Sequence, residues 1–416
     1  MPFEDRADYY VINTCSVTDN ADKKCRAIVR QTKRVAPNSK VIMIGCYAQL
    51  QPKEISEIEG VDLVVGAKEK FSLHKHLIAL NEKINDGNYS KYIAGEIEEV
   101  DAFIPSYSSG ERTRTFLKVQ DGCDYGCAFC TIPLARGKSR SATVDEVVQQ
   151  AKEIAEQGTK EIVLTGVNIG DFGKGNFGNR KATESFLDLI KALDAVENIE
   201  RFRISSIEPN LLNFDIIDFV ASSKKFMPHF HIPLQSGSDV LLKKMRRRYL
   251  TDLYTERIYH IKKIIPNCCI GVDVIVGFPG ETEELFLETY QYLNELPISY
   301  LHVFTYSERA NTLAIEMDEV VPIEVRHKRS KQLRILSEKK KRAFYESHLT
   351  QNKPVLFEKS KAEGMMQGFT NNYIKVEMPK NEADLNTVKM VRLNQLTDHL
   401  IIKADKLSQP LNNIIT

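Results

Sequence analysis

Short apolar runs alternate with polar, helix-like stretches along most of the chain, and this alternation predicts repeated strand–helix units. In the first hundred residues, "YYVINTC", "KVIMIGC" and "DLVVGA" have the composition of buried strands. The polar stretch between the first two runs, which ends at Pro37, has the pattern of a helix. Residues 1–100 are therefore predicted to form a small, Rossmann-like α/β domain with a parallel sheet.

A longer series of the same kind begins at residue 112. Its strand-like runs are "FLKVQ", "EIVLTG", "RFRISSIE", "HFHIPLQ", "CIGVDVIVGF" and "YLHVFTYS", and helical runs separate them. Six such units in a row predict a partial parallel (β/α) barrel over residues 112–345. Polar residues follow each strand, where barrel active sites form. The fold class is thus α/β.

The last part of the chain changes character. A charged helix is expected over residues 322–349, with nine Lys and Arg residues from Arg326 to Arg342. A solvated helix face and an RNA contact both explain this charge run. Beyond it, short strand-like runs separated by turn residues predict a small β-barrel over residues 350–416.

Composition excludes several classes of protein. The 57 basic and 56 acidic residues nearly cancel, so global charge points to no nucleic-acid or membrane partner. No signal peptide and no apolar run of about 18 residues is present, which predicts a cytoplasmic protein. Three of the eight cysteines crowd into one loop. In a reducing compartment such clustering favours a metal site over disulfides.

The crowded loop is "CDYGCAFC", with Cys123, Cys127 and Cys130 directly after a predicted strand. Three thiolates can hold three irons of a [4Fe–4S] cluster and leave the fourth iron without a protein ligand. A structural zinc is the alternative, but no fourth Cys or His follows at the usual spacing. Three other cysteines lie in different surroundings. Cys25 lies on an apolar helical stripe, and Cys268 and Cys269 precede a strand. These three are predicted to be packing residues.

The loop resembles the signature of the radical S-adenosylmethionine (SAM) superfamily, CxxxCxxC with an aromatic residue before the last cysteine, here Phe129. The resemblance implies that SAM binds the open iron and that Cys123, Cys127 and Cys130 hold the catalytic cluster. The segments "LTGVN", "RISSIEP" and "VGFPGE" end predicted strands at the mouth of the barrel, where they could contact SAM. The candidate cofactor contacts are Gly166, Ser205, Ser206, Glu208 and Gly277, and turns or solvated loop ends are the alternative for these positions.

Longer segments narrow the resemblance to the methylthiotransferases. They are "TIPLARGKSRS", "HIPLQSGSDVLLKKMRRRY", "DVIVGFPGETEE", "HVFTYSERANT" and, near the start, "VINTCSVTDNADKK". The tail resembles a TRAM module, a small RNA-binding β-barrel. The resemblance implies a second [4Fe–4S] cluster on the first domain, with Cys15 and Cys46 as ligands, and insertion of sulfur and a methyl group at an unreactive C–H bond.

In the family, the first domain opens with a strand and helix that carry the first of three cluster cysteines. This chain begins at "MPFEDRADYY", just before the counterpart of the second strand. We expect that the recorded sequence starts at the wrong methionine or comes from a fragment. The alternative is a chain that has lost a competent second cluster.

Among the branches of the family, the first segment most resembles enzymes that modify N6-threonylcarbamoyladenosine beside the tRNA anticodon. Isopentenyladenosine in tRNA and a ribosomal-protein aspartate are the alternative substrates. The resemblance implies three partners: tRNA, an electron donor such as a flavodoxin or ferredoxin, and a sulfur source. Candidate RNA contacts are Arg246, Arg247, Arg248, Phe369 and Tyr373, and a place in the barrel core is the alternative for the two aromatic residues.

Two other interpretations of the function stay open. One is a radical-SAM enzyme with a single working cluster that cleaves SAM or methylates without inserting sulfur. The other is an RNA-binding protein with a non-functional second cluster and a relic barrel. The complete set of Cys123, Cys127 and Cys130 argues against a relic, because one substitution would abolish the cluster.

Overall fold

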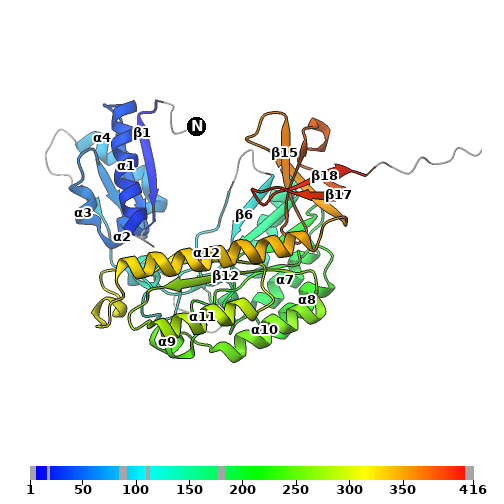
Figure 1. Ribbon diagram of the computed structural model, residues 1–416. Coiled ribbons are helices and arrows are strands. Elements are labelled where there is room, and N and C mark those ends of the chain that lie inside the picture. Colours follow the sequence, from blue (N-terminus) through cyan, green and yellow to red (C-terminus); the bar gives the residue numbers. More distant parts are fainter. Residues whose placement is uncertain (1–5, 16–18, 84–90, 109–112, 176–182, 408–416) are drawn as a thin grey trace, which may run out of the picture.

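The computed structural model describes residues 6–15, 19–83, 91–108, 113–175 and 183–407. Three parts follow one another along the chain: an N-terminal sheet, a central half-barrel and a C-terminal barrel. The N-terminal sheet and the C-terminal barrel stand over opposite ends of the half-barrel (Figure 1). The described chain contains no helix that is both long and apolar enough to cross a membrane.

The N-terminal sheet has four parallel strands in the order β1-β2-β3-β4, as the apolar runs predict. Its strands are β1 (Tyr9–Thr14), β2 (Lys40–Gly45), β3 (Leu63–Val65) and β4 (Tyr92–Ile93), and its helices are α1 (Asp19–Val35), α2 (Cys46–Leu50), α3 (Pro52–Ser56), η1 (Glu69–Ser72) and α4 (Leu73–Lys83). Cys25 of α1 is 6% exposed and belongs to the apolar core. Its predicted packing role is confirmed.

The half-barrel contains the six predicted parallel strands. They are β6 (Arg114–Lys118), β9 (Glu161–Thr165), β10 (Arg201–Ile204), β11 (His229–His231), β12 (Cys269–Val276) and β13 (Tyr300–Thr305). Parallel pairing runs from β6 through β9 to β10 and from β11 through β12 to β13. Parallel bridges from Phe202 to Phe226 and from Ser206 to His231 connect the two sets. The partial-barrel prediction is confirmed.

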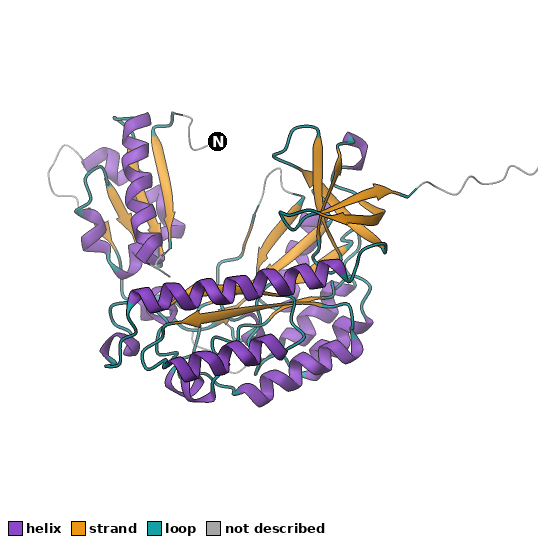
Figure 2. Cartoon of the chain, viewed as in Figure 1, coloured by secondary structure: helices purple, strands orange, loops and turns teal. Residues whose placement is uncertain are grey.

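Helices cover the outer face of the half-barrel (Figure 2). They are α6 (Val144–Glu156), α7 (Phe186–Asp194), α8 (Phe214–Ser222), α9 (Asp239–Lys244), α10 (Thr251–Ile264) and α11 (Glu283–Glu295). Alternate residues of β12, such as Val272 and Val274, are buried in the same apolar core as Phe286 of α11. Cys268 and Cys269 are also buried, at 0% and 1% exposure, so their predicted packing role is confirmed.

Short elements form the rim and the connections. They are η2 (Ile97–Glu99), β5 (Ser106–Tyr107), β7 (Gln120–Asp121), α5 (Ile132–Arg136), β8 (Arg140–Ser141), η3 (Ile169–Asp171), η4 (Leu313–Glu316) and η5 (Glu382–Asp384). The strand β5 pairs antiparallel with β6, and β7 pairs antiparallel with β8. The three-cysteine loop lies between β7 and β8 along the chain.

The predicted charged helix is α12 (Ile323–Glu346), which lies along β13. It is only partly a solvated face, because Arg326 and Arg329 point into the protein and are each 4% exposed. Arg329 pairs with Glu281 over 2.8 Å. Two cations of the predicted run therefore stabilise the packing of α12 and are not free to contact RNA.

The C-terminal barrel is closed, with strand order β14-β15-β16-β18-β17, and confirms the predicted β-module. Its strands are β14 (Asn352–Lys359), β15 (Met365–Thr370), β16 (Lys375–Pro379), β17 (Val388–Leu396) and β18 (Ile402–Lys406). It docks on β10 of the half-barrel. Arg201 donates a hydrogen bond to the carbonyl oxygen of Phe369 over 3.0 Å, and Arg203 donates one to Asn371 over 3.1 Å.

Candidate cluster-binding site

The three-cysteine loop leaves β7 and ends at α5. Gly122 starts it with φ of +71°, and a Cβ atom there would lie 2.0 Å from the carbonyl oxygen of Lys138. Only glycine fits this approach. The backbone N–H groups of Tyr125 and Ile132 donate to Cys123 Sγ and Cys130 Sγ over 3.4 and 3.5 Å. Such N–H···S contacts suit sulfur atoms that carry negative charge as metal ligands.

The three thiols lie in a partly buried environment. Burial raises the pKa of Cys123 to about 12 and that of Cys130 to about 11. Burial also raises the pKa of Cys127, although the charge of Arg247 acts in the opposite direction. Metal-free thiols are therefore protonated at neutral pH, and iron must displace those protons to bind.

Arg247 holds a position that its sequence context does not reveal. Its Nη1 donates to Cys127 Sγ over 3.1 Å, and its Nη2 pairs with Glu208. Only 4% of the Arg247 side chain is exposed. The prediction that Arg247 contacts RNA is thus wrong, because the guanidinium is buried between a carboxylate and a thiol.

The neighbouring arginines do face solvent. Arg246 is exposed and has φ of +56°. Arg248 is exposed as well, with its guanidinium 3.9 Å from the ring centroid of Tyr125 in the three-cysteine loop. These two predicted RNA contacts therefore lie at the mouth of the half-barrel.

The spacing of the thiols bears on the zinc alternative. Sulfur atoms that share one zinc ion lie within about 4.6 Å of each other, since each Zn–S bond is about 2.3 Å. In the described part of the chain, the one group of three potential ligands within 4.8 Å of one another is His231, Asp273 and His302. The three loop sulfurs do not form such a group, because they do not all lie within 4.8 Å of one another.

Hydrogen bonds account for the His231, Asp273 and His302 group. His231 Nε2 and Asp273 Oδ1 lie 2.8 Å apart, and His302 Nδ1 lies 3.3 Å from the same oxygen. Burial by itself raises the pKa of Asp273, but hydrogen bonds from the two imidazoles lower it to about 2. Asp273 and Cys130 line a common pocket of about 230 Å³. The group therefore lies beside the three-cysteine loop.

Phe129, predicted to contact the cofactor, lines this same pocket. Its ring packs edge-on against Phe278 with centroids 6.3 Å apart. Gly277 has φ of +77°, and a Cβ atom there would lie 2.3 Å from Arg326 Cγ. The glycine is needed for the approach of Arg326. Its backbone N–H donates to Glu281 over 2.7 Å.

The remaining predicted cofactor residues end the neighbouring strands. Ser205 and Ser206 follow β10 and are half-buried. Glu208 is also half-buried, but its carboxylate is engaged by Arg247. Gly166 follows β9, and a Cβ atom there would lie 3.0 Å from Gln120 Oε1. The close approach at Gly166 is therefore to the side chain of Gln120.

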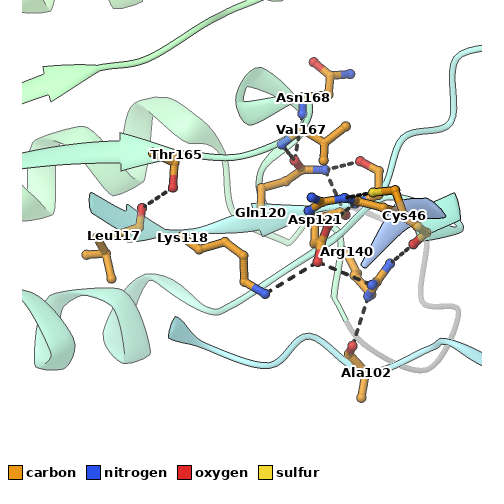
Figure 3. Close-up of polar contacts among 12 residues, drawn as sticks. Cys46, Ala102, Leu117, Lys118, Gln120, Asp121, Arg140, Thr165, Val167 and Asn168 are labelled. Atoms are coloured by element: carbon orange, nitrogen blue, oxygen red, sulfur yellow. Dashed lines mark hydrogen bonds and ion pairs between the residues drawn. The ribbon is translucent and has the colours of Figure 1, made fainter. Parts of the chain in front are cut away.

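Gln120 connects the segments that follow β7 and β9 (Figure 3). No sequence motif indicates this role. Its Oε1 accepts from the backbone N–H groups of Val167 and Asn168 over 2.9 and 2.8 Å. Its Nε2 donates to the carbonyl oxygen of Gly122 over 2.7 Å. One buried amide thus fixes the three-cysteine loop relative to the loop after β9.

The two remaining candidate ligands lie on the N-terminal sheet. Thr14 and Gly45 are partners in the parallel β1–β2 register, so Cys15 and Cys46 follow neighbouring strands at one edge of the sheet. Cys15 is exposed and Cys46 is half-buried. The sequence prediction that both lie at strand tips is confirmed. Arg136 of α5 donates its Nε–H to Cys46 Sγ over 3.3 Å.

The two predicted aromatic RNA contacts of the tail have protein partners. The ring of Tyr373 stacks on His229 with centroids 4.3 Å apart and on Phe369 with centroids 4.8 Å apart. The guanidinium of Arg114 lies 4.7 Å from the centroid of the Phe369 ring. Both rings contact residues of the half-barrel and are half-buried, and base stacking on them stays a prediction.

Comparison with known proteins agrees with these features. The model of the radical SAM superfamily matches residues 117–293, and that of uncharacterized protein family UPF0004 matches residues 1–66. The threonylcarbamoyladenosine tRNA methylthiotransferase MtaB of Bacillus subtilis is 39% identical over 398 residues, which cover 94% of this chain and 86% of the relative. The protein of the same name from Aquifex aeolicus is 38% identical, covering 94% and 92%.

Solved structures support the fold. The radical S-adenosylmethionine methyltransferase TsrM from Kitasatospora setae, with cobalamin and a [4Fe–4S] cluster bound, superposes with a TM-score of 0.56 at 14% identity. The match covers 76% of this chain and 67% of that one. The identity to the relatives over nearly the whole chain decides the family. The protein belongs to the radical-SAM methylthiotransferases and is an enzyme of that family, with SAM and [4Fe–4S] clusters as its cofactors.

Proposed function

We propose that this enzyme inserts a methylthio group at C2 of N6-threonylcarbamoyladenosine, next to the anticodon of tRNA. The relatives of 38% and 39% identity both carry the name of that activity, which favours it over isopentenyladenosine or a ribosomal aspartate. The reading as a relic RNA-binding protein is not favoured. The intact three-cysteine loop with its sulfur-directed N–H donors supports catalysis.

In this proposal Cys123, Cys127 and Cys130 hold the catalytic cluster. The observation that carries the assignment is the arrangement of three half-buried thiols on one loop, where backbone N–H groups donate to the sulfurs of Cys123 and Cys130. When bound, the cluster and SAM supply the one-electron chemistry that activates a C–H bond. The chain binds and orients both groups, and Arg247 keeps positive charge at the Cys127 sulfur.

SAM contacts are proposed from the strand ends around the loop. Phe129 offers an apolar wall, and Gly166, Ser205, Ser206, Glu208 and Gly277 lie on the turns that follow β9, β10 and β12. Asn168 and Asn210 add a further feature. Their Oδ1 atoms are buried and have no hydrogen-bond partner within the described residues. They offer acceptors for an ammonium or hydroxyl group of the cofactor.

The second cluster is proposed to bind at the edge of the N-terminal sheet through Cys15 and Cys46. The parallel register places them on adjacent strands, and Arg136 supplies an N–H donor to Cys46 Sγ. Arg246 and Arg248 are proposed to contact tRNA phosphates, since both are exposed beside the loop. A basic cluster of this kind positions RNA without reading its sequence.

We propose three domains, over residues 1–100, 112–345 and 350–416. The first holds the second cluster, the second carries out the radical chemistry, and the third is a TRAM-like module. A flavodoxin or ferredoxin would supply electrons, a separate donor would supply sulfur, and the cytoplasm would be the site of action. The two donors are proposed because the reaction consumes electrons and sulfur.

The test is mass spectrometry of tRNA nucleosides from a strain that lacks the gene. The methylthio form of threonylcarbamoyladenosine should be absent and should return when the gene is restored. The methylthio form of isopentenyladenosine should be unchanged. An unchanged threonylcarbamoyladenosine profile in the deletion strain would reject the substrate assignment.

A further inference from the structure

Arg136 and Asp121 connect Cys46 of the N-terminal sheet to the three-cysteine loop of the half-barrel. Arg136 donates from Nε to Cys46 Sγ over 3.3 Å and from Nη1 to Asp121 Oδ1 over 3.1 Å. Asp121 Oδ1 also accepts from the backbone N–H of Gly122 over 3.0 Å, and Cys123 follows directly. A continuous path of hydrogen bonds thus runs from Cys46 to the start of the three-cysteine loop.

The carboxylate in this path is unusually well held. Only 4% of the Asp121 side chain is exposed, and Lys118 and Arg140 approach its Oδ2 within 3.5 and 3.6 Å (Figure 3). A buried carboxylate in contact with three cationic side chains is a rigid anchor for the guanidinium.

The guanidinium suits this position because of its shape. A planar fork of N–H donors can serve two acceptors at fixed angles, which a lysine ammonium cannot do with the same precision. The helices α2 and α5, which carry Cys46 and Arg136, are in contact. A similar arrangement occurs in the three-cysteine loop, where Arg247 joins Cys127 Sγ to the carboxylate of Glu208.

We propose that the Asp121–Arg136 pair is a positioning clamp that fixes Cys46, and the cluster it holds, at a set distance from the catalytic cluster. The inference rests on the proposed function, since it takes Cys46 as a ligand of the second cluster. Sulfur insertion needs the sulfur-bearing cluster close to the substrate carbon at the moment that carbon is activated. SAM cleavage needs only the catalytic cluster. Loss of the clamp should therefore impair sulfur insertion and leave SAM cleavage intact.

The decisive variant is Arg136→Gln, compared on the reconstituted chain with unaltered protein. Deoxyadenosine formation from SAM is expected to persist, while the ratio of methylthio product to deoxyadenosine falls by about tenfold or more, as for other outer-shell partners of metal ligands. Lys68→Gln is the matched control. It removes a cation from an exposed ion pair with Glu99 on the same N-terminal part, and the ratio should not change.

Two readouts do not depend on product formation. In a Cys127→Ala background, which removes the catalytic cluster, the midpoint potential of the second cluster should fall with Arg136→Gln. An N–H···S bond and a nearby positive charge both favour the reduced cluster, so their loss lowers the potential. Hydrogen exchange of the α2 backbone should also become faster, because the clamp no longer holds the helix.

Arg136→Lys guards against a variant that simply misfolds. It keeps the charge beside Asp121 but loses the fork, so it should recover part of the product ratio. An unchanged potential and an unchanged ratio in Arg136→Gln would overturn the clamp, as would an equal fall in SAM cleavage and product. If unaltered protein forms no methylthio nucleoside, the proposed function fails. The midpoint potential of the second cluster and the hydrogen exchange of α2 still test the clamp in that case.

Discussion

The guanidinium of Arg247 lies 3.1 Å from the sulfur of Cys127 and is held there by Glu208. It thus places a buried positive charge directly on a predicted cluster ligand. Hydrogen bonds and charges around the sulfurs are among the features that set the potential of an iron–sulfur cluster. Arg247 is therefore placed to act on the predicted catalytic cluster, and its side chain is buried away from solvent.

Replacement of Arg247 by Gln removes this charge and leaves Glu208 without its cation. We expect the potential of the catalytic cluster to fall and the rate of SAM cleavage to drop by about 10- to 100-fold. Deoxyadenosine formation and electron paramagnetic resonance of the reduced cluster measure both effects. Lys243→Gln is the control, because Lys243 is exposed on the nearby helix α9. Normal SAM cleavage in Arg247→Gln would contradict the assignment.

The difference between Arg247 and its neighbours shows where sequence reasoning stops. The three-cysteine loop could be predicted because its ligands are close in sequence and their spacing is set by the cluster. Three successive arginines, by contrast, look alike. The buried one, Arg247, is marked by its contact with Glu208, which lies 39 residues away along the chain.

The same reason explains the other residues that were missed. The six-stranded half-barrel follows from local apolar periodicity, and the closed tail from short strands and turns. The contact between Cys46 and Arg136 joins residues 90 positions apart, and that between Tyr373 and His229 joins two separate parts of the fold. A local sequence pattern does not predict these contacts, because they form only when the separate parts of the fold pack against one another.

Tyr373→Ala tests the docking role of the tail aromatics. Loss of the stack on His229 should speed hydrogen exchange in β15 and β16, since the ring joins the C-terminal barrel to the half-barrel. The affinity for tRNA should change by less than about threefold, well under the 1–3 kcal/mol per base that a stacking contact contributes. A tenfold loss of tRNA affinity with unchanged exchange would instead make Tyr373 a base-stacking residue.

Gly277→Ala tests the fit of α12 against the strand ends. The new methyl group would meet Arg326 Cγ at 2.3 Å, and Arg326 is buried and hydrogen-bonded to Val321. Together with the positive φ, the clash should cost about 3 kcal/mol in the free energy of unfolding. Thermal and urea unfolding measure the cost.

Gly364→Ala separates the two causes at Gly277. Gly364 has a similar φ, +71°, but nothing lies within 4 Å of a Cβ atom there. It should cost only about 1 kcal/mol, from the backbone conformation alone. Equal destabilisation by the two substitutions would show that contact with Arg326 does not matter.

Asp62 makes the stability of the N-terminal sheet dependent on pH. Burial by itself raises the pKa of Asp62, but hydrogen bonds from the backbone N–H of Val41 and from Lys33 lower it below its ordinary value. A lowered carboxyl pKa contributes stability above the unfolded pKa of about 4 and loses it as the pH falls through the folded value.

Asp62→Asn should therefore destabilise the sheet by about 1–2 kcal/mol at pH 7, and the difference from unaltered protein should shrink below about pH 4. Hydrogen-exchange protection of β2, compared between the two proteins at each pH, measures it. A difference that stays constant down to pH 3 would show that the charge of Asp62 is not the source of the stabilisation.

The most direct test of the central claim uses SAM with a deuterated methyl group, the anaerobically reconstituted chain, a reductant and tRNA that contains N6-threonylcarbamoyladenosine. Mass spectrometry of the digested tRNA should show a methylthio nucleoside that carries the deuterated methyl group, together with deoxyadenosine. Cys127→Ala should form neither product. Deoxyadenosine without any methylthio nucleoside would contradict the proposed function, and methylthio product from Cys127→Ala would contradict the proposed site.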